Sequence, residues 1–345
     1  MLAHPTLPGP RRHRGGPASG GVREMRRCAW ALAALLAASP LAAVAQTCRG
    51  DAARPVPVTG VAGSLQNPCL SPDGTALAFT NFKRRYNQGG AIVWTVPAAG
   101  GAPARALSPR VGAQSVNLPG QCWSAAGNAV VYSSDVVDRD EIYIVPAAAG
   151  AAKRLTDRPG FLAWEPSISP MLADRSQWIV FESHREADPD GAGELWKMKV
   201  DGSGLARLTQ GADDRQPQWS PRGDRIAFQR QVKPGQWDVM TIDAAGRGLL
   251  NVTRAPSRGN TGPSWSPSGA WIVYSAGGPD LDNANLFVIS ATGGAPVRLT
   301  VNCGYDGAPG WSADGRTIAF ESAPYDPDTR GSTTLWTIAA PAGMR

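Results

Sequence analysis

The stretch from Gln216 to Arg230, QPQWSPRGDRIAFQR, decides the fold, because close variants of it recur along the chain. A segment ending at Trp219 runs into a Ser-Pro-x-Gly turn, and an apolar segment, Ile226 to Gln229, follows it. Proline presets the backbone of such a turn, and glycine tolerates the conformations that a tight turn requires. The unit is therefore predicted to be a β-hairpin.

The serine that follows the first strand serves as a reference position for comparing the copies. Six copies lie 45 to 53 residues apart, at Ser71, Ser124, Ser169, Ser220, Ser266 and Ser312. A strand-rich repeat of this length is typical of four-stranded β-propeller blades. We predict an all-β, six-bladed β-propeller.

The sixth repeat lacks a fourth strand, because the chain ends soon after LWTIAA. The segment Ala53 to Thr59, ARPVPVT, matches the fourth-strand pattern although it precedes every first strand. Pairing this segment with the last blade would close the ring and remove an open sheet edge. Pro55 and Pro57 suit an outermost strand, where alternate N–H groups face solvent. We therefore predict that an N-terminal strand completes the last blade.

The amino terminus has the pattern of an export signal. Arg26 and Arg27 precede an apolar run from Ala29 to Leu36, and small residues follow up to Ala45. This is typical of a secretory signal peptide, and the run is shorter than the roughly 20 residues of a membrane span. We predict a disordered or mis-started extension at 1–24, a signal peptide at 25–45 and a propeller at 46–345, periplasmic or secreted.

Charge gives no indication of a nucleic-acid partner. The whole chain has a formal charge of +6, but six arginines and one glutamate lie in residues 1–45. The remainder therefore has a net charge of +1, and it has no basic footprint of the kind that nucleic-acid-binding domains carry. We expect a monomer with neither a membrane span nor a nucleic-acid partner.

Export makes disulfides possible among the four cysteines after the leader. Cys69 and Cys122 occupy equivalent places in successive repeats, so they would lie on neighbouring inner strands. They form either a disulfide or a pair of free, buried thiols, since a bridge requires closely placed Cα atoms. A bridge between Cys48 and Cys303 is the less favoured alternative.

The repeats resemble the TolB family of propellers. The best-matching stretch runs from Phe181 to Gln229 and holds the second strand, the Asp-Gly-x-Gly hairpin, the Leu-Thr ending and the Trp-Ser-Pro turn. The resemblance covers nearly all of Ala53 to Ala340. It implies a periplasmic six-bladed propeller that acts as a protein-binding platform. TolB has an additional amino-terminal domain, whereas only Gln46 to Ala52 precede the ring here.

The chain contains few of the residues and motifs that are typical of enzyme active sites. His184 is the one histidine outside the leader, and its place at the end of a second strand predicts a solvated loop residue. The chain has no G-x-S-x-G nucleophile elbow and no H-E-x-x-H metal helix. We therefore expect a non-enzymatic protein without a cofactor.

Acidic loops provide one candidate metal site. Asp280, Asp282 and Asn285 alternate carboxylate and amide oxygens, which are ligands that Ca²⁺ prefers. The spacing lacks the glycine and the distal glutamate of a full calcium loop. Asp and Asn residues that hydrogen-bond their own backbone in a turn are the simpler interpretation.

Residues that depart from the repeat pattern indicate a partner surface. Most tryptophans fall on strand positions and are expected to pack between blades. The others lie near loops that should share one face of the ring with several polar residues. This set, as a candidate partner-binding surface, consists of Trp164, Asp213, Arg215, Trp237, Tyr305 and Asp306. Aromatic residues and arginine are enriched at the energetic centres of interfaces.

The sequence therefore favours an exported propeller that binds an envelope protein or a peptidoglycan-associated partner. One alternative is a metal-dependent propeller enzyme that cleaves carbohydrates or peptides. Another is a receptor for a glycan or small ligand at the channel mouth.

Overall fold

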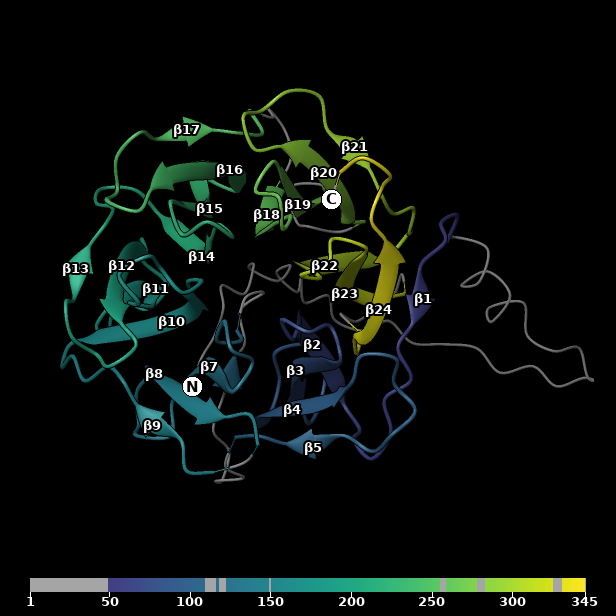
Figure 1. The fold of residues 1–345 in the computed structure, drawn as a ribbon, viewed down its shortest axis with the longest axis horizontal. Helices are drawn as coiled ribbons and strands as arrows, with labels where there is room; N and C mark the ends of the chain where they lie inside the picture. The colour runs from purple at the N-terminus through teal and green to yellow at the C-terminus, as the bar shows by residue number, and fades with distance from the viewer. Residues whose placement is uncertain are drawn as a thin grey trace, which may run out of the picture.

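The computed structural model describes residues 49–108, 116–117, 122–148, 150–254, 259–277, 283–324 and 331–344. The described strands form six four-stranded antiparallel sheets arranged as the blades of a ring (Figure 1). This confirms the predicted six-bladed β-propeller. The signal peptide and the extension before it lie outside the described residues.

The strands of each blade follow one another in the chain, from the centre of the ring outwards. Blade 1 contains β2 (Ser64–Leu70), β3 (Ala76–Phe82), β4 (Ala91–Pro97) and β5 (Arg105–Ala106). Blade 2 contains β6 (Val116–Asn117), β7 (Ala129–Ser134), β8 (Glu141–Pro146) and β9 (Lys153–Arg154). Blade 3 contains β10 (Phe161–Ile168), β11 (Trp178–Arg185), β12 (Glu194–Lys199) and β13 (Ala206–Arg207).

The remaining three blades repeat this order. Blade 4 contains β14 (Asp214–Trp219), β15 (Arg225–Lys233), β16 (Gln236–Asp243) and β17 (Leu250–Asn251). Blade 5 contains β18 (Gly259–Trp265), β19 (Trp271–Gly277), β20 (Asn285–Ser290) and β21 (Val297–Arg298). Blade 6 contains β22 (Tyr305–Trp311), β23 (Thr317–Ala323), β24 (Thr334–Ala339) and, as its outermost strand, β1 (Arg54–Pro55).

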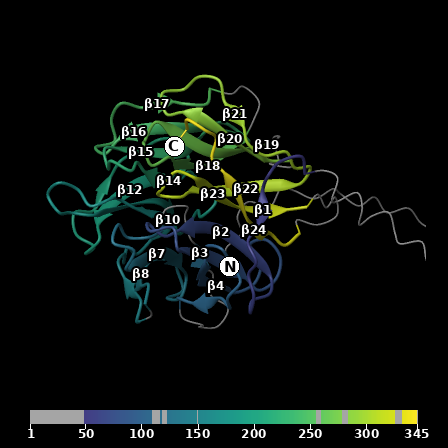
Figure 2. The same ribbon diagram turned by 45° about the vertical axis from the view of Figure 1, so that its right-hand side comes forward.

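The ring is closed by the amino-terminal segment, as predicted. Arg54 pairs with Thr337 and Pro55 with Trp336, so that β1 lies beside β24 in both views (Figures 1 and 2). Beyond β1, the Val56 N–H donates to the carbonyl of Leu335 at 2.8 Å. The side chain of Val56 is buried in the core between blades 6 and 1. The first and last blades are therefore joined both by backbone hydrogen bonds and by apolar packing.

This closure gives a first stability prediction. Replacing Val56 with alanine removes two buried methyl groups, and we expect it to lower the free energy of unfolding by about 1 to 2 kcal/mol. The midpoint of urea denaturation measures the change. Val297 in β21 is the matched control, because it is also in an outermost strand but is 42% exposed. An equal cost at the two positions would contradict a role for Val56 in closure.

The core lies between neighbouring blades. The aromatic residue of each second strand is fully or almost fully buried, as Phe79, Tyr132, Phe181, Phe228, Tyr274 and Phe320 show. The tryptophans that end β14, β18 and β22 are buried as well, in agreement with the predicted packing role. No helix among the described residues is long and apolar enough to cross a membrane.

The cysteines distinguish between the sequence alternatives. Cys69 and Cys122 are free and buried, and the Cys122 N–H donates to the sulfur of Cys69 at 2.8 Å. Cys303 is disulfide-bonded. Its predicted partner, Cys48, lies outside the described residues. Of the two alternatives for Cys69 and Cys122, the structure therefore shows the free, buried thiols, which pack in the core between blades 1 and 2. The bridge between Cys48 and Cys303 remains a prediction.

Candidate functional site

The innermost strands carry a bulge at a repeated position. Five of them carry a residue with positive φ at the equivalent position, where the pairing with the second strand shifts register. These residues are Asn67, Glu165, Gln216, Gly262 and Ala308, with φ between 45° and 60°. The left-handed conformation frees their N–H groups from the strand ladder, so that a neighbouring blade can bind them.

Side chains from the adjacent second strands bind three of these N–H groups. Glu182 accepts from Gln216 at 2.7 Å and Gln229 accepts from Gly262 at 3.1 Å. Glu321 accepts from Asn67 at 2.8 Å, across the junction between blades 6 and 1. The acceptor is in each case the residue that follows the buried aromatic. These contacts link blade 3 to blade 4, blade 4 to blade 5 and blade 6 to blade 1.

Glu321 belongs to a buried cluster of polar groups. Its other carboxylate oxygen accepts hydrogen bonds from the hydroxyls of Tyr305 at 3.0 Å and Tyr86 at 3.1 Å. Burial raises the pKa of Glu321 to about 7, although these hydrogen bonds act in the opposite direction. Burial, followed by the charges of Glu182 and Glu321, also raises the pKa of Glu165 well above its ordinary value. Burial therefore favours the protonated form of both carboxyl groups.

His184 lies between Glu182 and the β11–β12 loop. It is 1% exposed and lies within β11, so the predicted solvated loop position was wrong. Its Nδ1 donates to the carbonyl of Gly191 at 3.1 Å, and its Nε2 lies 3.4 Å from Glu182. The ring packs on Trp164, with 4.4 Å between ring centroids. Strand pairing buries His184 because the second strand of blade 3 is longer than the repeat pattern indicates.

Trp164 lies within β10 rather than before it, and it is half-buried. Next to it, burial raises the pKa of Asp140 to about 7, against a hydrogen bond from Trp164 that lowers it. Trp164 is therefore held between His184 and Asp140, and only part of its ring is open to a partner.

Three residues of the predicted surface come together above blade 4. Arg215 donates to both carboxylate oxygens of Asp213, at 2.8 and 3.0 Å, and to the carbonyl of Gly191. Its guanidinium lies 5.5 Å from the ring centroid of Trp237. Although burial opposes it, the hydrogen bond to Asp213 raises the pKa of Arg215. We call Asp213, Arg215 and Trp237 the blade 4 cluster.

The other two predicted residues lie on blade 6. Asp306 is completely buried, and it accepts from Arg49 at 2.6 Å and from Asn302 at 2.9 Å. Tyr305 is half-buried and turned toward Glu321. These two residues therefore do not join the other four in one surface. Asp306 anchors the segment that precedes β1, and Tyr305 belongs to the buried polar cluster around Glu321.

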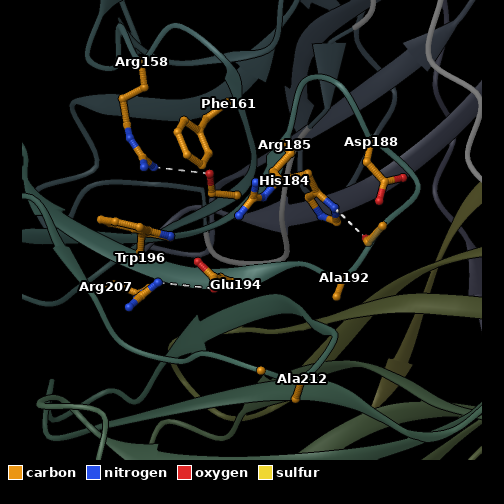
Figure 3. Close-up of a pocket in the computed structure, with 13 residues that line it drawn as sticks. Arg158, Phe161, His184, Arg185, Asp188, Ala192, Glu194, Trp196, Arg207 and Ala212 are labelled. Carbon is orange, nitrogen blue, oxygen red and sulfur yellow. Dashed lines mark hydrogen bonds and ion pairs between the residues drawn. The ribbon is translucent and has the colours of Figure 1, made fainter.

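A pocket of about 470 Å³ opens beside the blade 4 cluster, on the end of blade 3 (Figure 3). Its walls come from the segment before β10, the end of β11, the β11–β12 loop, β12, β13 and the β13–β14 loop. Arg158, Phe161 and Trp196 lie toward one end, and Ala192 and Ala212 toward the other (Figure 3). Sequence reasoning missed this pocket, because most of these residues occupy ordinary loop or strand positions in the repeat.

The predicted metal site remains a prediction. Asp280 and Asp282 lie outside the described residues. The side-chain oxygen of Asn285 accepts from the N–H of Asn302 at 2.7 Å. Within the described parts of the chain, no group of three His, Cys, Asp or Glu residues is placed to hold a metal ion.

These features define a six-bladed propeller with a buried polar cluster around Glu321 and a pocket on the loop face of blade 3. The model of the TolB β-propeller domain, PD40, matches residues 44–281. The chain therefore belongs to this family, which confirms the resemblance stated from the repeats.

Individual relatives show how far the likeness extends. The chain is 27% identical over 217 residues to the uncharacterised protein Atu1656 of Agrobacterium fabrum, covering 59% of this chain and 67% of that protein. It is 26% identical over 249 residues to the tricorn protease homolog 1 of Streptomyces coelicolor, covering 68% of this chain but 22% of that longer protein. The crystal structure of TolB from Acinetobacter baumannii shares the fold, with a TM-score of 0.56, 18% identity and coverage of 82% and 66%.

Proposed function

We propose that this protein is an exported, non-enzymatic binding platform of the cell envelope. The loop face over blades 3 and 4 would engage a protein or a peptidoglycan-associated partner. The observation that carries the proposal is the pocket over blade 3, which adjoins the blade 4 cluster. Gly191 links the two, because it lines the pocket and its carbonyl accepts from Arg215 at 3.3 Å.

The blade 4 cluster supports this function through its rigidity. Arg215 is fixed by two bonds to Asp213 and one to Gly191, so little side-chain freedom remains to be lost on binding. Trp237 lies beside it and is half-buried, which leaves part of its apolar surface for a partner. Pre-ordered arginine and tryptophan groups are favourable anchors for an interface.

Site-specific photo-crosslinking tests the platform. A benzophenone amino acid is placed at Ala192 or Ala212 on the loop face, and at Ala245 on the opposite face as the matched control. Ala245 is exposed in the hairpin between β16 and β17. After irradiation in a cell-envelope extract of the producing organism, we expect the same crosslinked species from both loop-face positions and none from Ala245.

Two results would contradict the platform. One is a crosslinking pattern that does not differ between the two faces. The other is hydrolysis of a carbohydrate or peptide by the purified protein that depends on an added divalent metal. The latter would favour the enzyme alternative.

A further inference from the structure

The pocket over blade 3 contains a half-buried arginine, Arg158. The side chain of Arg158 forms no ion pair with any residue in the described parts of the chain, and its one side-chain hydrogen bond there is to Ser183 at 3.3 Å. The side chain is half-buried, and this burial lowers the pKa of Arg158 although nearby carboxylates oppose it. Partial burial of an unpaired guanidinium is unfavourable unless another group compensates its charge.

Two aromatic rings hold this guanidinium in place. Its central carbon lies 4.0 Å from the ring centroid of Trp196 and 4.4 Å from that of Phe161. Stacking on rings leaves the edge of a guanidinium plane available, and that edge presents paired N–H donors to a carboxylate. Figure 3 shows Arg158 and Trp196 at the same end of the pocket.

The charged side chains are distributed unevenly along the pocket. Arg207 also belongs to the Arg158 end, where it lies 3.5 Å from Glu194 and 5.9 Å from the ring centroid of Trp196. Asp188 lies toward the other end, near Ala192 (Figure 3). The Arg158 end therefore holds two arginines and the carboxylate of Glu194, whereas Asp188 lies toward the other end, with Arg185 between the two ends (Figure 3). An anionic group would be attracted to the Arg158 end and repelled from the Asp188 end.

The shape of the pocket favours a peptide over a sugar. Phe161 and Trp196 each give a face to the Arg158 guanidinium, which leaves less aromatic surface for stacking against a sugar ring. Small residues line the far end and leave room for a main chain, namely Gly191, Ala192, Gly211 and Ala212. The volume of about 470 Å³ lies within the usual range of ligand sites.

We propose that this pocket binds the carboxylate of a peptide segment, to which the guanidinium of Arg158 donates two parallel N–H···O bonds. The inference rests on the proposed function and names the chemistry that the loop face recognises. The carboxylate is either a chain terminus or an Asp or Glu side chain, and the experiment distinguishes these two sources.

Calorimetric titration with short synthetic peptides tests the proposal. Three acetylated alanine-glycine pentapeptides are compared: one with a free carboxyl terminus, one amidated with an internal glutamate, and one amidated with glutamine at that position. We expect at least one carboxylate peptide to bind with a Kd between about 10 μM and 1 mM. The glutamine peptide is expected to bind at least about tenfold more weakly, because charge-assisted hydrogen bonds are lost.

Variants of two arginines locate the site. Arg158→Lys keeps the charge but loses the planar fork, and we expect binding to weaken about tenfold or more. Arg158→Gln is expected to weaken it further. Arg222→Gln is the matched control, because Arg222 is exposed in the turn between β14 and β15 on the opposite face. Thermal melting of each variant checks that the fold is retained.

Two outcomes would overturn the proposal: no binding of any carboxylate peptide, or equal binding by the Arg158 and Arg222 variants. These outcomes are distinguishable from failure of the platform itself. If the peptides do not bind but crosslinking remains specific to the loop face, the carboxylate assignment alone is wrong.

Discussion

Replacing Trp219 with alanine is expected to lower the free energy of unfolding by about 3 to 5 kcal/mol, because it leaves a large cavity between two blades. Trp219 is 1% exposed and ends the innermost strand of blade 4. It packs in one cluster with Val180 and Leu195 of blade 3 and with Ile226 of its own blade. These neighbours belong to regular strands and cannot collapse into the space without disturbing the sheet pairing.

Urea denaturation followed by tryptophan fluorescence or circular dichroism measures this loss. Trp237→Ala is the control, because it removes the same side chain from a half-buried position on the loop face. We expect the control to cost about 1 kcal/mol or less. If the two substitutions cost the same, Trp219 does not have the interblade packing role described here.

Replacing Glu321 with glutamine is expected to raise stability at pH 8 by up to roughly 3 kcal/mol. The pKa of Glu321 is about 7 in the folded protein, above the ordinary value of 4.5, because burial disfavours the carboxylate. The unfolded chain therefore releases this proton at lower pH than the folded chain does. Stability falls as pH rises from about 4.5 to 7, and the penalty is complete above pH 7. Glutamine stays neutral and avoids it.

The hydrogen bonds of Glu321 can be kept by glutamine. Its carbonyl oxygen can accept from the N–H of Asn67, and its amide can donate to the hydroxyls of Tyr86 and Tyr305. The measurement is the free energy of unfolding at several values between pH 5 and pH 8. Near pH 5 the two proteins should be most similar. A difference that does not change with pH would contradict a titrating Glu321.

Some of the pH dependence should remain in this variant. Burial raises the pKa of Asp140 to about 7 and raises that of Glu165 as well. Because both acids have a higher pKa in the folded protein than in the unfolded chain, each of them also lowers the free energy of unfolding as pH rises. The slope of stability against pH should therefore become shallower in Glu321→Gln without reaching zero.

The fold could be predicted because each blade repeats the same local requirements. Trp219 and its equivalents, the Ser-Pro-x-Gly turn and the apolar second strand appear at a regular spacing, and each satisfies a need of a single blade. The closure by β1 could be predicted from one missing strand and one unassigned segment. Both inferences depend on strand pairing, which the alternation of residues along the chain records.

The binding features depend on contacts that no single repeat contains. Arg158 meets Trp196 and Phe161 only after the connection from blade 2 folds over blade 3. Asp306 looked like a surface residue, but Arg49 from the other end of the chain covers it. One indication was present in the sequence: the residue after the second-strand aromatic is Glu in blades 3 and 6 and Gln in blade 4, whereas blades 1, 2 and 5 have Thr or Ser. Those three longer side chains are the ones that bind the neighbouring bulges.

The most direct test of the loop-face pocket is the arginine side-chain NMR spectrum during a titration with the carboxylate peptides. The Nε–H resonance of Arg158, assigned by its loss in Arg158→Lys, reports on the guanidinium that is stacked between Trp196 and Phe161. We predict that it shifts in a saturable manner with a carboxylate peptide and not with the glutamine peptide, while the resonance of Arg222 stays in place. A resonance of Arg158 that does not move, or that moves no more than that of Arg222, would contradict carboxylate recognition at this pocket.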